Sequence, residues 1–177
     1  STSLADYGDD SLLQLSHQEG FAGSLSVHDR ICHWRRPIDF QPPRLTEDEG
    51  AMFREGDRLT ETGIHANYFE DYTLIDDGGG RFLALACPEH RRLLVSVGSR
   101  FLFAPGRTLA LPKGITLNHL VSQAEPEQKR ALLDCELSLG HSLGDGLQSD
   151  AAWRIDLSTL PFREGQSLLA GGLWRFD

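Results

Sequence analysis

Basic residues are scarce in this sequence, which has 17 Lys and Arg against 26 Asp and Glu and a net charge of −9. A protein that binds nucleic acid needs a basic face that can replace the counterions of the phosphate backbone. The densest basic spots, Arg35 with Arg36 and Arg91 with Arg92, are only two residues long. The composition therefore argues against a nucleic-acid partner and, for the same electrostatic reason, against an acidic membrane surface.

Long apolar runs and paired cysteines are also lacking. No run approaches the roughly 18 apolar residues of a membrane span, and no signal-type segment opens the sequence. The three cysteines, Cys32, Cys87 and Cys135, are widely spaced and lie in apolar, strand-like stretches. Their number and spacing fit neither a metal site nor a complete set of disulfides. We therefore expect buried structural thiols and a cytoplasmic location.

Alternation of apolar and polar residues is the main pattern that is present, and it indicates strands with one buried face. In residues 32–40 one face carries Cys32, Trp34, Arg36, Ile38 and Phe40. Pro37, which lacks an N–H, places this strand at an edge or a bend. Other strand-like segments, separated by turns, are residues 51–54, 58–62, 68–75, 81–87, 92–97, 101–103, 108–111 and 153–157, with a last strand at 167–169 or 173–176.

Residues 118–134 have a helix-like composition, but 115–122 and 131–139 both alternate around a loop that contains Pro126. We predict a long hairpin here, with room for a single helical turn at 126–130. The polar, acidic residues 1–10 predict a loosely held tail, followed by one domain over residues 11–177. The whole pattern predicts an all-β, lipocalin-like antiparallel barrel of roughly ten strands with little helix, since a closed barrel has no edges and can hold a small ligand.

Several segments follow one another in a familiar order: residues 21–24, an aromatic strand around Trp34, residues 61–63, the aromatic and acidic segment 68–72, and residues 93–101. Over residues 21–103 the chain resembles the Hri-one family of fungal and related proteins, named after a yeast protein that binds a casein-kinase-type kinase. The resemblance implies antiparallel β-barrels without established catalytic residues. Because the chain is shorter than the two-barrel members on its N-terminal side, we expect a single barrel with extra strands. The resemblance does not imply a kinase partner for this chain, because no recognised set of residues encodes kinase binding.

Polar side chains occur on strand faces that are otherwise apolar. An apolar cavity with a few polar anchors is the usual composition of a small-molecule site, and burial would raise the pKa of a glutamate toward the range of a general acid or base. The binding candidates are Trp34, Arg36, Tyr68 and Tyr72, and the acid–base candidates are Glu61, Glu70 and His65. Two alternatives stay open. In the first, Arg36 forms a buried ion pair with Glu61 or Glu70 and there is no ligand site. In the second, the strand over residues 68–75 turns its other face inward, so that Phe69 is buried and Tyr68, Glu70 and Tyr72 face the solvent.

Metal, phosphate and serine-nucleophile motifs are missing. None of the seven histidines forms a His-x-His pair or an HExxH motif. The glycine-rich segments 78–80 and 144–146 lie between β-type segments and predict turns, because a phosphate loop leads into a helix. No serine lies in a GxSxG elbow. We expect neither a metal nor a cofactor.

The first functional hypothesis is a barrel that binds a small, largely apolar molecule in its interior. Catalysis of a cofactor-free isomerisation or cyclisation, in an accessory biosynthetic role, is an extension of it. The alternative is a non-catalytic, kinase-binding-like interaction module with an acidic surface. A third hypothesis is an oligomeric scaffold, such as a homodimer, whose exposed strands pair between subunits.

Overall fold

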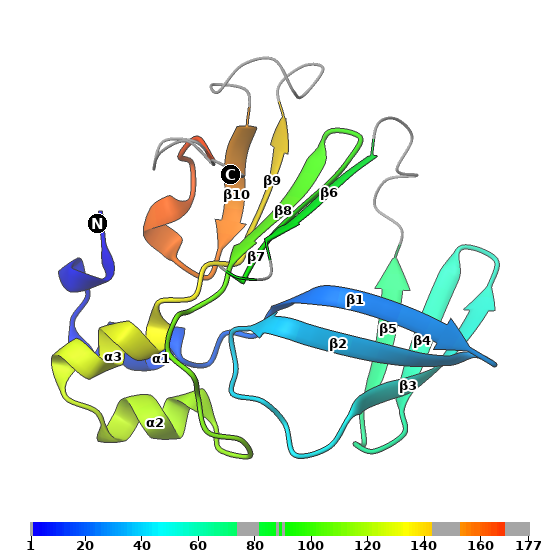
Figure 1. The fold of residues 1–177 in the computed structure, drawn as a ribbon, viewed down its shortest axis with the longest axis horizontal. Coiled ribbons are helices and arrows are strands. Elements are labelled where there is room, and N and C mark those ends of the chain that lie inside the picture. Colours follow the sequence, from blue (N-terminus) through cyan, green and yellow to red (C-terminus); the bar gives the residue numbers. More distant parts are fainter. Residues whose placement is uncertain (1, 74–81, 88, 90, 143–152, 169–177) are drawn as a thin grey trace.

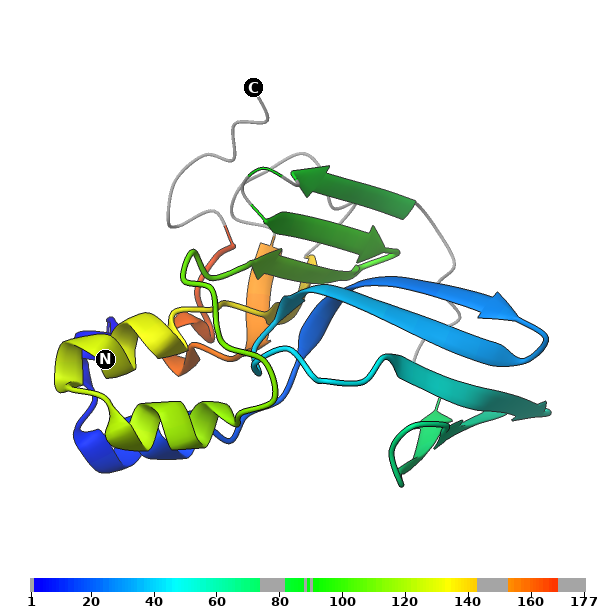
Figure 2. The ribbon, with the colours of Figure 1, turned by 60° about the horizontal axis from the view of Figure 1, so that its bottom comes forward.

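Two five-stranded antiparallel sheets and a group of short helices make up the computed structural model, which describes residues 2–73, 82–87, 89, 91–142 and 153–168 (Figure 1). The first sheet is a meander of β1 (Phe21–His28), β2 (Ile31–Asp39), β3 (Asp48–Glu55), β4 (Arg58–Gly63) and β5 (Phe69–Thr73). The second consists of β6 (Phe82–Cys87), β7 (Arg92–Val97), β8 (Arg100–Pro105), β9 (Ser138–Ser142) and β10 (Trp153–Ser158). Figure 2 shows the long β1–β2 hairpin running from the second sheet out to β3–β5.

The mainly antiparallel β architecture predicted by the alternation is confirmed, with ten strands among the described residues. Within each sheet, every strand pairs with strands that are its neighbours in the chain. The connection between β8 and β9 is long and contains two helices. Within the described residues neither sheet closes on itself, so closure into a lipocalin-like barrel stays a prediction. The turns expected at 78–80 and 144–146, and a strand at 173–176, lie outside the described residues. No helix in the described part of the chain is long and apolar enough to cross a membrane.

The hairpin predicted over 115–122 and 131–139 is wrong, because α2 (Leu117–Gln123) and α3 (Pro126–Leu133) occupy most of it. Thr116 caps α2 by accepting a hydrogen bond from the His119 N–H, and Pro126 begins α3 inside a capping box. These capping residues, together with apolar residues spaced four apart, outweigh the local alternation. Residues 108–111, also predicted as a strand, form a loop.

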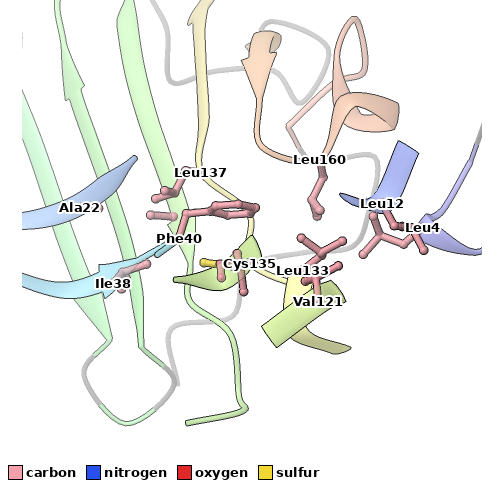
Figure 3. Close-up of a cluster of buried hydrophobic side chains, with 12 residues drawn as sticks. Leu4, Leu12, Ala22, Ile38, Phe40, Val121, Leu133, Cys135, Leu137 and Leu160 are labelled. Atoms are coloured by element: carbon pink, nitrogen blue, oxygen red, sulfur yellow. The ribbon is translucent and has the colours of Figure 1, made fainter. Parts of the chain in front are cut away.

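The main hydrophobic core joins the helices to both sheets (Figure 3). Phe40, just after β2, and Leu133, at the end of α3, are fully buried in it. Leu12 of α1 (Asp9–Leu15) and Leu160, which precedes the 3-10 helix η3 (Pro161–Arg163), pack from the far side. Leu4, in the short 3-10 helix η1 (Leu4–Asp6), belongs to the same core, which differs from the loose N-terminal tail that the sequence predicts.

Strand β2 leaves its neighbour β3 halfway along its length. Only residues 31–34 pair with β3, whereas the pairing with β1 continues to Asp39. The β1–β2 register shifts between Ala22 and Ser24, opposite Pro37, where a side chain at Gly23 would overlap the β2 backbone. The edge or bend predicted at Pro37 is therefore present. Beyond residue 34 one side of β2 is open, and this opening creates the cleft described below.

Candidate functional site

A buried carboxylate, Glu61, is the centre of the polar cluster on the first sheet. Its side chain lies on β4 and is 1% exposed. The indole N–H of Trp34 donates to both carboxylate oxygens, at 3.1 and 3.2 Å. The hydroxyls of Tyr68 and Tyr72 donate to one oxygen each, at 2.7 and 2.9 Å. The carboxylate on β4 thus accepts hydrogen bonds from β2, from β5 and from the residue just before β5.

The hydrogen bonds to Glu61 decide its protonation state. Burial raises the pKa of this carboxyl, but donors from Tyr68, Cys32, Tyr72 and Trp34 outweigh burial and leave the pKa below its usual range. Burial and the Glu61 carboxylate together raise the pKa of Tyr68, so this phenol stays a donor. The expectation that burial raises the Glu61 pKa toward that of a general acid is therefore wrong, because the carboxylate is stabilised as an anion.

Space for this cluster comes from Gly50 on β3, the strand between β2 and β4. A Cβ atom at Gly50 would overlap the Glu61 carboxylate. The adjacent Cys32 is fully buried, and its thiol donates to the Gly50 carbonyl at 3.1 Å. Burial and Glu61 raise the pKa of Cys32 to about 11, so the thiol is protonated at neutral pH. As expected from the sequence, Cys32 and Cys135 are buried and form no disulfide. Cys87 also forms no disulfide, but it is half-buried rather than buried as predicted.

Arg36 pairs with neither Glu61 nor Glu70. Arg36 forms ion pairs with two aspartates: its Nε lies 2.6 Å from Asp48 Oδ2, and its Nη1 lies 3.5 Å from Asp39 Oδ2. The contact of Nε with Asp48 does not have the geometry of a hydrogen bond. The guanidinium also stacks over the Phe21 ring, 3.8 Å from its centroid. Phe21 in turn meets Trp34 edge to face at 5.4 Å. This contact chain connects Arg36 to the Glu61 cluster through aromatic rings.

The sequence-predicted residues fall into two groups in the structure. Trp34, Glu61, Tyr68, Tyr72 and Glu70 are joined by hydrogen bonds, the last through a short bond from the Tyr72 hydroxyl. They share one side of the sheet, so the opposite parity for strand 68–75 does not hold. Glu70, however, is exposed. Their roles in binding or catalysis stay predictions.

His65 belongs to a separate ionic group built around Glu49. His65 Nε2 lies 2.8 Å from Glu49 Oε2, and His33 Nδ1 lies 2.5 Å from Glu49 Oε1. Hydrogen bonding from His65, with a smaller contribution from His33, lowers the pKa of Glu49. No group of His, Cys, Asp or Glu in the described ranges has an arrangement that could hold a metal ion.

A cleft of about 620 Å³ lies beside the free half of β2. Its walls come from β2, from the ends of β1 and β3 beside it, from the loop between β2 and β3, from Arg91 and from the loop after β8. They include Trp34, Arg36, Pro43, Asp48, Arg107, Leu109 and Leu111. Glu61, Glu70 and Tyr72 are not among its lining residues. The open space thus adjoins the Glu61 cluster through Trp34 but does not contain the carboxylate.

Arg107 is the most deeply buried charge of this cleft, with 5% of its side chain exposed. Its guanidinium donates to the main-chain carbonyls of Asp39 and Phe40, at 3.2 and 2.8 Å, and its Nε has no hydrogen-bond partner among the described residues. Burial lowers the pKa of Arg107, an effect that the nearby Asp39 partly offsets. Arg91 donates to the Pro37 carbonyl at 2.7 Å.

Sequence reasoning missed Gly50, Asp48, Glu49, Arg91 and Arg107. The acidic segment at the start of β3 was a local signal for Asp48 and Glu49, because half-buried carboxylates need cationic or hydrogen-bonding partners. Arg91 and Arg107 lie in turns more than 50 residues from the β2 carbonyls that they contact. No local pattern identifies such contacts, since the packing of the two sheets creates them.

Comparisons of the chain with protein-family models, with curated proteins and with solved structures give no match.

Proposed function

We propose that the protein binds a small molecule in the cleft beside β2. The observation that carries the proposal is the cleft itself: about 620 Å³, with a mainly polar lining that includes a few apolar side chains, such as Trp34, Leu109 and Leu111, and a buried guanidinium. This volume lies within the roughly 300–1,000 Å³ that is typical of ligand sites. The lining combines apolar side chains with polar groups that protein contacts hold in place. The sequence placed the ligand in the barrel interior, whereas the space around Glu61 is filled by hydrogen-bonded side chains.

Binding is better supported than cofactor-free isomerisation or cyclisation. A general base needs an oxygen within reach of the substrate and a pKa near the working pH. Both oxygens of Glu61 already accept hydrogen bonds, and the pKa of this carboxyl is low. His65 is held by Glu49 and does not line the cleft. We therefore assign the Glu61 cluster the role of fixing Trp34, one wall of the cleft, in place.

Two predictions from the sequence remain proposals: a lipocalin-like barrel and a cytoplasmic location. The barrel would require the two antiparallel five-stranded sheets to close into one structure of ten strands. All three cysteines are free, which suits a reducing compartment such as the cytoplasm.

The interaction-module hypothesis has one observation in its favour. Phe53 on β3 and Phe69 on β5 are 52% and 63% exposed on the outer face of the first sheet. Exposed aromatic residues of this kind are enriched where proteins meet. This surface faces away from the Glu61 cluster and supplies a matched control for the binding test.

The test is a fluorescence titration with N-phenyl-1-naphthylamine, a neutral dye that brightens in apolar sites. We expect saturable binding with one site, weakened at least about tenfold by Leu109→Asp, because the new carboxylate replaces an apolar lining residue and must be desolvated by the dye. Leu109 is 44% exposed, so the change does not disturb the core.

The control variant is Phe69→Asp, which places the same charge on the outer face. We expect the dye affinity of this variant to equal that of the wild type. Unchanged affinity in Leu109→Asp, or loss of binding in Phe69→Asp alone, would show that the cleft is not the site.

A further inference from the structure

An excess of cations over available anions distinguishes the cleft from the rest of this acidic protein. Its lining includes five arginines against four carboxylates. Three of those carboxylates are engaged: Asp48 by Arg36 and Arg44, Glu49 by His33 and His65, and Asp39 by Arg36. The remaining carboxylate, Glu47, is exposed in the loop between β2 and β3.

Arg107 has no carboxylate within ion-pair distance among the described residues, although its side chain is 5% exposed. Buried charges in proteins are normally paired, because the cost of removing a cation from water is otherwise only partly recovered by neutral acceptors. Main-chain carbonyls accept from two of its nitrogens, and the third, Nε, has no partner. A lining residue with this unmet requirement points to an anion supplied from outside.

Arg91 places a second cation beside the first. The N–H of Gly106, next to Arg107, donates to the Arg91 carbonyl at 2.8 Å. Arg91 has a φ of 49°, a left-handed conformation that residues other than glycine seldom adopt. Its guanidinium is exposed at the cleft and donates to the Pro37 carbonyl, and it too has no carboxylate partner in the described part of the chain. Two neighbouring guanidinium groups that repel each other are a suitable clamp for one anionic group.

We infer that the ligand of the cleft is an amphipathic organic anion, an apolar body that carries a carboxylate or phosphate group held by Arg91 and Arg107. This inference rests on the proposed binding function and adds the chemical class of the ligand. The apolar body lies against Trp34, Leu109 and Leu111, which line the same cleft. Arginine is suited to the head group because its planar fork pairs with both oxygens of a carboxylate or phosphate.

The test compares three probes with one ring system by titration calorimetry: 2-naphthoate, 2-naphthyl phosphate and the neutral 2-naphthalenemethanol. We expect at least one of the two anions to bind about tenfold or more tightly than the alcohol. The tighter of the two anions identifies the head group. Arg91→Gln should lower the affinity for that anion about tenfold and leave the affinity for the alcohol unchanged.

Arg54→Gln is the matched control, because Arg54 is exposed at the far end of β3 and the variant has the same net charge as Arg91→Gln. It should bind all three probes as the wild type does. If the alcohol binds as tightly as both anions, or if Arg54→Gln weakens the anion as much as Arg91→Gln does, the anion assignment is wrong and the cleft remains a site for neutral molecules. If none of the probes binds, the proposed function itself fails.

Discussion

Replacing Glu61 by Gln lowers the free energy of unfolding by about 4 kcal/mol at pH 7, whereas Glu70→Gln changes it by less than about 0.5 kcal/mol. The carboxylate of Glu61 accepts from Trp34, Tyr68 and Tyr72 in a fully buried site. Gln removes the charge and turns one acceptor into a donor that faces other donors, so buried groups lose their partners. Glu70 carries the same charge but is exposed, and the amide oxygen of Gln can still accept the hydrogen bond from the Tyr72 hydroxyl. Urea unfolding of both variants measures the difference.

The pH dependence of the Glu61→Gln effect follows from the lowered pKa of Glu61. A carboxyl whose pKa is lower in the folded than in the unfolded state stabilises the protein above its ordinary pKa of 4.5, and this stabilisation is lost as the pH falls through the folded-state value. The gap in unfolding free energy between wild type and variant should therefore be constant near neutral pH and narrow below about pH 4.5. A gap that widens in acid, or equal stabilities at pH 7, would contradict the assigned role.

Gly50→Ala lowers the free energy of unfolding by about 3 kcal/mol, near the upper end of the usual cost of overpacking. The added methyl group would overlap the Glu61 carboxylate, which cannot move away because three side chains hold it. Gly8→Ala is the control, since a Cβ atom there has no neighbour within 4 Å. Denaturant midpoints should separate the two variants clearly. A Gly50→Ala variant as stable as Gly8→Ala would show that Glu61 is free to rearrange.

Most strands were predictable because apolar and polar residues alternate along a strand that has one buried and one exposed face. The Glu55–Gly56–Asp57 turn with its flanking strands, and the face shared by Trp34 and Glu61, follow from a period of two. The prediction failed at α2 and α3, where Thr116 and Pro126 mark helix starts that were given too little weight. A segment of about seven residues can fit both the two-residue repeat of a strand and the 3.6-residue repeat of a helix. Capping residues are then the better guide to whether the segment is a helix.

The polar cluster was predictable and the cleft was not. A period of two puts Tyr68 and Tyr72 on one face of their strand, and the sequence left open whether Glu61 lies on the same side of the sheet. The hydrogen bonds of both tyrosines to Glu61 show that it does. The position of Arg107 depends on how the loop after β8 packs against Asp39 and Phe40. Burial raises the pKa of Glu61 as the sequence-based expectation assumed, but hydrogen bonds that lower it outweigh burial. The sequence does not show how many donors surround a carboxylate in the folded protein.

The most direct test of the central claim, a ligand site in the cleft beside β2, is a ¹H–¹⁵N NMR titration with 2-naphthoate. Trp34 lines the cleft through its ring while its indole N–H donates to Glu61, so its indole resonance reports on both. We predict shifts of this resonance, assigned with Trp34→Phe, and of the backbone amides of residues 107–111, with Phe53 and Phe69 unchanged. Shifts confined to Phe53 and Phe69, or no shifts at saturating probe, would contradict the claim.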